Sequence, residues 1–203
     1  QGLGQFKTAI KYQERHLEIA KEVGDKAGEG RSYGNLGNAY HGLGEFKRAI
    51  EYHQRHLKIA TEVEDKAGEG ISYGDLGKAY HCLGKFKTAI EYQQRHLEIA
   101  KEVGDKNGEG RSYGNLGNAY QGLGLFKTAI EYQERHLEIA KDVGDKAGEG
   151  QSYGNLGNAY QGLELFKTAI KRHQLSLEIA KKKRETRLER DEVMAISAMP
   201  IMV

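Results

Sequence analysis

The chain has 203 residues, of which 38% are hydrophobic and 30% charged, so its length allows one or two domains. Its 31 basic and 29 acidic side chains nearly cancel, which gives no support for nucleic acid or a membrane surface as a ligand. No apolar run is long enough to span a membrane, and the single cysteine, Cys82, cannot form an internal disulfide. These features predict a cytoplasmic protein, and a first residue other than methionine indicates a piece of a longer chain.

The leading segment, residues 5–23, has the apolar spacing of a helix. After it, the glycine-rich stretch GEGRSYGNLGNAYHGLGEF of residues 28–46 returns three times, with equivalent tyrosines forty residues apart at Tyr33, Tyr73, Tyr113 and Tyr153. A fixed period of this length predicts a stacked repeat architecture, in which each unit buries its apolar face against its neighbours.

Each repeat is predicted to contain two antiparallel helices joined by a short turn. In the first copy Asp25 is a good N-cap for a helix that ends near Leu43, and Gly44 can adopt the left-handed turn conformation. A second helix then runs from about Glu45 to about Val63. Four such pairs are expected to start near residues 25, 65, 105 and 145.

Glycines inside the first helix of each pair are unfavourable on their own. Each interior glycine costs a helix about 1 kcal/mol relative to alanine, and the first copy carries both Gly34 and Gly37. We therefore expect these glycines to let neighbouring helices approach closely, so that stacking outweighs their local cost.

The repeat resembles a known family in the residues Leu36-Gly37-x-x-Tyr40, Gly44, Phe46 and Ala49. This pattern resembles the signature of tetratricopeptide repeats. The forty-residue period and the phrases GNLGNAY, RHLEIA and GDKAGEG are similar to the long repeats of the LGN/Pins family of polarity adaptors. The resemblance covers residues 1–181. It implies an all-α, right-handed superhelical solenoid of antiparallel helix pairs, with the first helices lining a concave groove.

Two departures limit what the resemblance implies. His56 and a longer second helix stand where shorter tetratricopeptide repeats often close with alanine and proline. LGN/Pins proteins also carry GoLoco motifs that bind Gα subunits, and nothing in this sequence matches those motifs. Binding of Gα is therefore not carried over to this chain.

A polar stripe on the first helices is the candidate binding site. At 100° per residue, Arg31, Asn35 and Asn38 fall on one face, roughly opposite Tyr33 and Leu36. The resemblance implies that this groove binds an extended peptide, with arginine and asparagine as the contacting residues. Arginine suits a carboxylate, and asparagine can both donate to and accept from a peptide backbone. The equivalent residues in the later copies are Ile71, Asp75, Lys78, Arg111, Asn115, Asn118, Gln151, Asn155 and Asn158.

A merely solvated polar face is the alternative to a binding groove. Because asparagine and glycine are poor helix formers, a purely solvated face would more often carry glutamate, lysine or glutamine. The favoured function is therefore a noncatalytic scaffold for protein–protein interaction, whose partner is an acidic or amphipathic peptide segment of another protein. The alternatives are a structural repeat module that self-associates end to end, and a designed or consensus-like array without a natural ligand.

Histidine and cysteine give no support for metal binding or catalysis. His16, His56, His96 and His136 occupy one repeat position, so neighbouring histidines are separated by a repeat, roughly 10 Å. That separation is too large for shared zinc ligation, and a packing role is expected instead. Cys82 replaces a glycine in a single copy, and no P-loop is present. We expect no enzyme activity, cofactor or metal, and no nucleic-acid or membrane partner.

The last copy departs from the pattern, with Glu164 in place of the turn glycine. Residues 182–203 are predicted to form a helix extension and an apolar tail. The acids interleaved in KKKRETRLERDE favour a solvated helix over a basic binding patch. The tail is expected to fold back over the last second helix, and the alternative is that it packs against the N-terminal end of another molecule.

Overall fold

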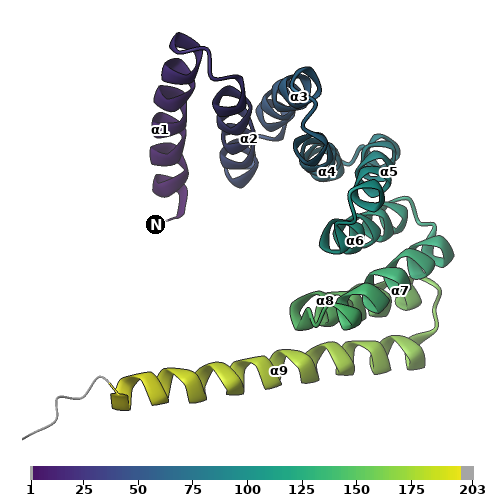
Figure 1. Cartoon of the computed structure of the whole chain (residues 1–203). Helices are drawn as coiled ribbons and strands as arrows, with labels where there is room; N and C mark the ends of the chain where they lie inside the picture. The colour runs from purple at the N-terminus through teal and green to yellow at the C-terminus, as the bar shows by residue number, and fades with distance from the viewer. Residues whose placement is uncertain (1, 198–203) are drawn as a thin grey trace, which may run out of the picture.

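A computed structural model describes residues 2–197, which form nine α-helices and no strand (Figure 1). The helices are α1 (Gly2–Glu22), α2 (Lys26–Gly42), α3 (Phe46–Glu62), α4 (Lys66–Cys82), α5 (Phe86–Glu102), α6 (Lys106–Gly122), α7 (Phe126–Asp142), α8 (Lys146–Gly162) and α9 (Phe166–Ser197). Within this range no helix is both long and apolar enough to cross a membrane.

Successive helices form antiparallel pairs that curve into an open arc (Figure 1). The helices α2, α4, α6 and α8 line the inner side of the arc, α3, α5 and α7 form its outer side, and α1 and α9 are its two ends. Each helix packs against its neighbours in the chain, and each inner helix also contacts the next inner helix. The predicted all-α superhelical solenoid of antiparallel helix pairs is confirmed.

The helix ends follow the residues that the sequence provides for them. Asp25 caps α2 by accepting a hydrogen bond from the backbone N–H of Gly28 at 2.8 Å. Gly44 adopts φ +76°, the left-handed conformation that ends the helix cleanly. Glu164, in place of the turn glycine, adopts φ +60° all the same. The last turn therefore keeps the geometry of the others and carries the strain of a side chain there.

The apolar core is distributed over the layers of the repeat. Leu36 on α2 is fully buried among Leu17 of α1, Tyr33, and Ile59 of α3. The leucines at the same position in the later copies are also fully buried, at Leu76, Leu116 and Leu156. Each layer thus takes its core from three consecutive helices, as expected for a stacked array.

Glycines on the inner helices make room for polar side chains of the outer helices. A Cβ atom added to Gly37 would lie 2.5 Å from Cε1 of His53, and one added to Gly77 would overlap Nε2 of Gln93. His53 and Gln93 are each 1% exposed. The predicted close approach of the helices at Gly37 is confirmed, and the side chains that fill the space are polar.

A histidine–serine hydrogen bond ties each repeat to the next. Nδ1 of His56 on α3 lies 2.8 Å from Oγ of Ser72 on α4, and Ser72 in turn donates to the carbonyl oxygen of Gly68. Because the hydroxyl hydrogen is used for Gly68, His56 carries its proton on Nδ1 and donates to the serine. The same bond recurs in the pairs His16–Ser32, His96–Ser112 and His136–Ser152.

These histidines have the packing role that their sequence position predicts. His96 and His136 are buried, whereas His16 on the terminal helix α1 is exposed. Among the described residues, no group of three histidine, cysteine, aspartate or glutamate side chains is placed to hold a metal ion.

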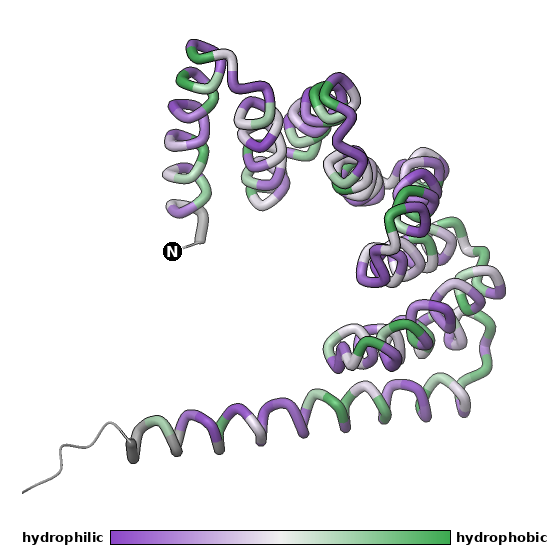
Figure 2. The backbone as a smooth tube through the Cα atoms, viewed as in Figure 1, coloured by the Kyte–Doolittle hydropathy of each residue, from purple (hydrophilic) through white to green (hydrophobic). Residues whose placement is uncertain are grey.

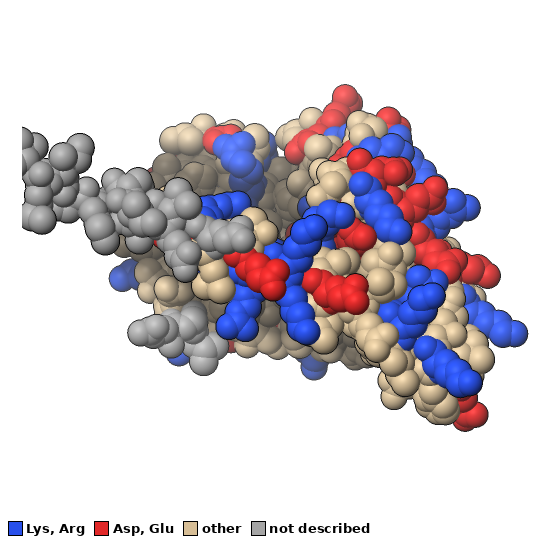
Figure 3. Space-filling model, turned by 90° about the horizontal axis from the view of Figure 1, so that it is seen from below, with Lys and Arg blue, Asp and Glu red and all other residues tan. Residues whose placement is uncertain are grey.

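The helix α9 continues unbroken past residue 181 and extends beyond α8 (Figure 1). Its middle part is mostly hydrophilic (Figure 2), and on the face seen from below basic and acidic side chains are interspersed (Figure 3). Residues 182–197 are therefore helical, and their charged side chains are exposed wherever the structure describes them. The expectation that residues 192–203 fold back is wrong for 192–197, because they continue α9 as a helix. Residues 198–203 lie outside the described part of the chain.

The glycine at one repeat position offers a matched test of close packing. A methyl group added in Gly114→Ala would lie 2.9 Å from Nδ1 of His136, whereas in Gly154→Ala the nearest atom is Oγ of Ser176 at 3.5 Å. Alanine favours a helix over glycine by about 1 kcal/mol, but overpacking costs about 1–3 kcal/mol. We expect Gly154→Ala to raise the free energy of unfolding. The free energy of unfolding of Gly114→Ala should be about 1–3 kcal/mol lower than that of Gly154→Ala. Denaturant unfolding measures both, and equal effects would contradict the packing shown.

Buried histidines predict a loss of stability in mild acid. Burial lowers the pKa of His53 from 6.5 to about 4, against a smaller opposing effect of Asp75. Burial also lowers the pKa of His96 to about 4. The unfolded chain therefore binds protons that the folded chain does not, so the free energy of unfolding falls as the pH drops from about 6.5 toward 4.

The variant His53→Gln isolates one of these two groups. Glutamine is the natural residue at the equivalent positions Gln93 and Gln133, so the packing should tolerate it. We expect a shallower pH dependence in urea unfolding, reduced by up to about 1.4 kcal/mol per pH unit between pH 6.5 and 4. An unchanged profile would show that His53 binds protons equally in the folded and unfolded chains, so that burial does not lower its pKa.

Candidate functional site

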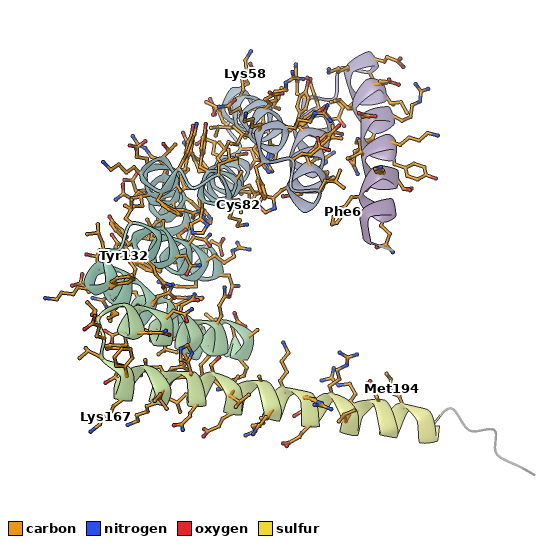
Figure 4. All side chains as sticks on the ribbon, turned by 180° about the vertical axis from the view of Figure 1, so that it is seen from behind. Phe6, Lys58, Cys82, Tyr132, Lys167 and Met194 are labelled. Atoms are coloured by element: carbon orange, nitrogen blue, oxygen red, sulfur yellow. The ribbon has the colours of Figure 1, made fainter. Side chains whose placement is uncertain are left out.

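The polar stripe predicted from the sequence lies on the four inner helices. Eight of its twelve residues are exposed, and the other four, Asp75, Asn115, Asn118 and Asn155, are half-buried. Figure 4 shows Cys82 on the inner side of α4, facing the open space of the arc, whereas Lys58 and Tyr132 lie on the outer side. The structure brings the central part of the stripe together with Cys82 in one pocket, so this part faces the inner surface.

The charged stripe residues have partners within the chain. The guanidinium of Arg31 lies 3.7 Å from a carboxylate oxygen of Asp25, and that of Arg111 lies 3.6 Å from Asp105. All four side chains are more than 40% exposed, so solvent screens these pairs strongly and leaves the arginines accessible. The α4 copy has Ile71 at the position of these arginines, and this side chain is exposed and uncharged.

The α4 copy forms an ion pair of its own within the stripe. Nζ of Lys78 lies 2.8 Å from Oδ1 of Asp75. The opposite charges of Lys78 and Asp75 thus neutralise each other on α4. This layer therefore presents a nearly neutral surface between the layers of Arg31 and Arg111.

Two of the asparagines form hydrogen bonds with the neighbouring helices α1 and α7. Nδ2 of Asn35 donates to Oε1 of Gln13 on α1 at 3.3 Å. Oδ1 of Asn118 accepts from Nε2 of Gln133 on α7 at 2.9 Å, which leaves the amide N–H groups of Asn118 for other partners. Nδ2 of Asn155 is buried without a hydrogen-bond partner among the described residues.

A pocket of about 180 Å³ lies at the centre of this surface. It is formed by α2, α4, α5 and α6, with the lining residues His41, Gly77, Lys78, His81, Cys82, Ala89, Gln93, Asn115 and Asn118. Its size fits one side chain and is below the roughly 300–1,000 Å³ typical of pockets for drug-sized ligands. Sequence reasoning predicted three of these residues, Lys78, Asn115 and Asn118, and missed the rest.

Gln93 is the pocket residue with the least satisfied polar group. Its Nε2 donates to the carbonyl oxygen of Gly74 at 2.8 Å, which fixes the orientation of the amide. Its Oε1 is buried and has no hydrogen-bond partner among the described residues. The signal in the sequence was a polar residue at a position that the helical period places in the core, where the other copies have His53, Gln133 and His173.

Two titratable groups of the pocket, His41 and Cys82, have pKa shifts that favour their neutral forms. Burial lowers the pKa of His41, and the nearby Lys78 lowers it further. Burial raises the pKa of the Cys82 thiol, whose Sγ lies 3.7 Å from Nε2 of His41. A raised thiol pKa disfavours the thiolate, which is the reactive form of cysteine.

Larger hollows lie elsewhere and are more open. One of about 600 Å³ lies against α7, where Arg135 pairs with Glu138 at 3.2 Å. Another, of about 630 Å³, lies between the start of α8 and the middle of α9 and is lined by Lys182, Lys183 and Arg190 among others. Charged, exposed side chains form most of both hollows. The pocket on the inner surface differs because a buried polar group lines it.

The comparisons with known proteins agree on the kind of fold. The chain is 52% identical over 33 residues to G-protein-signaling modulator 1 of Homo sapiens, a match to 16% of this chain and 5% of that protein. This short match is consistent with the resemblance to the LGN/Pins family.

Two solved structures share the fold along most of the chain. BtubC from P. vanneervenii superposes with a TM-score of 0.80 at 24% identity, over 89% of this chain and 75% of that one. A putative kinesin light chain of Podosopora anserina, with nearly identical TPR-like repeats, superposes with a TM-score of 0.71 at 21% identity, over 89% of each chain. The family model for the tetratricopeptide repeat matches residues 1–62, 43–102 and 108–182, and the chain therefore belongs to the tetratricopeptide repeat family.

Proposed function

We propose that this chain, a tetratricopeptide repeat scaffold suited to protein–protein interaction, is not an enzyme and binds an extended, acidic peptide segment of another protein along its inner surface. The observation that carries the proposal is the row of accessible polar residues on consecutive inner helices, with a pocket of side-chain size in its middle. A row of this kind matches the length of an extended chain better than that of a compact ligand.

The arginines support an acidic ligand. Arg31 and Arg111 lie two repeats apart, and each is held only by an exposed ion pair. Such a pair contributes little to stability, so a ligand carboxylate can replace it at small cost. Hydrogen bonds to a charged group contribute about 1.5–3 kcal/mol. Two arginines can therefore supply much of the affinity of a moderately tight peptide complex.

The asparagines support recognition of an extended backbone. An asparagine side chain has one acceptor and two N–H donors, the same groups that a peptide bond presents. The stripe repeats an asparagine at Asn35, Asn115 and Asn155. A ligand that runs along the arc meets such a group on three of the four inner helices.

Other partners are less compatible with the charges of the chain. The formal net charge is +2, and basic and acidic side chains are interspersed on the face seen in Figure 3. Neither feature provides the continuous positive surface that nucleic acid or an anionic membrane requires. The proposal also places the chain in the cytoplasm, where a single unpaired cysteine is common.

Charge reversal tests the arginine contacts. The double variant Arg31→Glu, Arg111→Glu should bind an acidic peptide, selected from a displayed random library, at least about tenfold more weakly than the unchanged chain, because each lost charged contact contributes about 1.5–3 kcal/mol. Fluorescence anisotropy with the labelled peptide measures the affinity, and circular dichroism checks that helicity is kept.

A matched pair of arginines on the outer helices controls for net charge. Arg95 and Arg135 are exposed and pair with Glu98 and Glu138 on their own helices. The variant Arg95→Glu, Arg135→Glu makes the same charge change away from the stripe and should bind the peptide as the unchanged chain does. Equal affinity of both double variants for the peptide would show that Arg31 and Arg111 do not contact it.

A second candidate function is self-association through the two ends of the arc. Tyr12 on α1 is 72% exposed, whereas its equivalent Tyr52 stacks on Tyr40 with ring centroids 5.2 Å apart. On α9, Ile170 and Leu177 are each more than half exposed. Burial of apolar surface is favourable by about 25 cal/mol per Å², so these faces favour association.

The geometry of the ends sets a limit on how they can meet. Both α1 and α9 correspond to second helices of the repeat, and in the internal copies a glycine-bearing first helix covers each such face. Direct contact of α9 with α1 would join two bulky faces without the glycines that let helices interlock.

Light scattering over a range of concentrations tests this second candidate. If the ends associate, the mass should rise with concentration, and Leu177→Arg should return it to that of a monomer. A monomer mass at all concentrations would remove self-association. Failure of a random library to yield any binder would instead favour an array without a natural ligand.

A further inference from the structure

The pocket on the inner surface contains an acceptor that nothing in the described chain satisfies. Gln93 is 1% exposed, and its Nε2 is committed to the carbonyl oxygen of Gly74 at 2.8 Å. The carbonyl oxygen of Gly74 can accept only from the NH₂ group of Gln93, so the unpaired atom of Gln93 is Oε1. Oε1 has essentially no accessible surface, so a ligand donor reaches it only after a shift of the Gln93 side chain. The new hydrogen bond then offsets the cost of leaving a buried acceptor unpaired.

The α6 residues that line the pocket supply donors. Asn115 and Asn118 of α6 line the pocket, and Oδ1 of Asn118 already accepts from Nε2 of Gln133 at 2.9 Å. The free groups of Asn118 are therefore N–H donors. The lining thus includes an acceptor on Gln93 of α5 and donors on Asn118 of α6, together with the small residues Gly77 and Ala89.

We propose that this pocket binds one carboxamide side chain, an asparagine or glutamine of the ligand peptide. In the complex the Gln93 side chain shifts toward the pocket, so that the NH₂ group of the ligand donates to Oε1 of Gln93 and the carbonyl oxygen of the ligand accepts from the amide of Asn118. The inference rests on the proposed peptide-binding function and adds a sequence requirement to it. The pocket belongs to the α4 layer, between the layers of Arg31 and Arg111, so the amide lies between two acidic contacts of the ligand.

Other side chains fit the pocket less well. A carboxylate has only acceptors and would place one of them against Oε1 of Gln93. A cation would enter a pocket that already contains Lys78, and an apolar side chain would leave Oε1 of Gln93 unpaired. A hydroxyl can also donate and accept, but it does both through one oxygen atom, whereas a carboxamide has a separate atom for each role.

Two residues make the pocket a particular feature of the α4 copy. Cys82 stands where the other copies have glycine, at Gly42, Gly122 and Gly162, so its side chain adds a wall that they lack. His81 stands where the next copy has Gln121. The layer that departs from the arginine–asparagine pattern is therefore also the one that carries the pocket.

Selection from a random dodecamer library displayed on phage tests the proposal. The unchanged chain should enrich peptides with asparagine or glutamine at one fixed position. The shape-matched variant Gln93→Met removes the acceptor and should lose this enrichment. Replacing the enriched amide by leucine should weaken binding to the unchanged chain about tenfold, the effect of one neutral hydrogen bond, and should leave binding to Gln93→Met unchanged.

Two further variants separate recognition from stability. His53→Met changes the buried residue at the same position of the preceding copy, which does not line the pocket, and should keep the amide preference. Cys82→Tyr fills the pocket from an exposed position without touching the bond between Gln93 and Gly74, and should abolish the preference. Thermal melting checks that all variants are folded.

The outcomes distinguish this inference from the function on which it rests. Peptides without a fixed amide, or an amide preference that survives in both Gln93→Met and Cys82→Tyr, would overturn the inference while the binding itself upholds the groove. No retained peptide at all would overturn the groove and, with it, the pocket assignment.

Discussion

The structure depends on the close approach of glycine-bearing inner helices to polar side chains of the outer helices. At Gly37 and Gly77 the missing side chain is the space that His53 and Gln93 occupy. The glycines are unfavourable within an isolated helix, so this helix is stable only when its partner fills the gap. The contact that holds a pair together is therefore also the contact that brings a buried polar group beneath the inner surface.

This arrangement separates the residues that hold the array together from those that vary along it. Serine and leucine are constant at the contacts between repeats, as in Ser72 and Leu76, and the histidine–serine bond joins each outer helix to the next inner one. Because each repeat contacts only its neighbours, a change on the exposed stripe leaves these contacts intact. The α4 copy demonstrates this, since it carries Ile71 in the stripe and keeps the same layer geometry.

The sequence was sufficient to predict features that a single residue determines locally. It was also sufficient to predict the stacking of helix pairs, which follows from the forty-residue repeat. The forty-residue spacing predicted the solenoid, Asp25 predicted a helix start, and 100° per residue predicted which side chains of α2 are exposed. It could not predict the pocket, because Gln93 lies on a different helix from the stripe and reaches the inner surface only past Gly77. It was also wrong about residues 192–197, since an apolar composition does not fix the direction of a helix that has no turn residue to end it.

Unpaired buried polar atoms recur in several layers of the array, which connects stability with the proposed recognition. Besides Oε1 of Gln93, the atoms without partners among the described residues include Oε1 of Gln121, Oε1 of Gln133 and Nδ2 of Asn155. They come from inner helices or from side chains that pack against inner-helix glycines. A chain selected only for stability would gain by replacing such groups with apolar ones of similar shape. Under the proposed function, a ligand chain that draws these side chains toward the inner surface would form hydrogen bonds with them and offset this cost on binding.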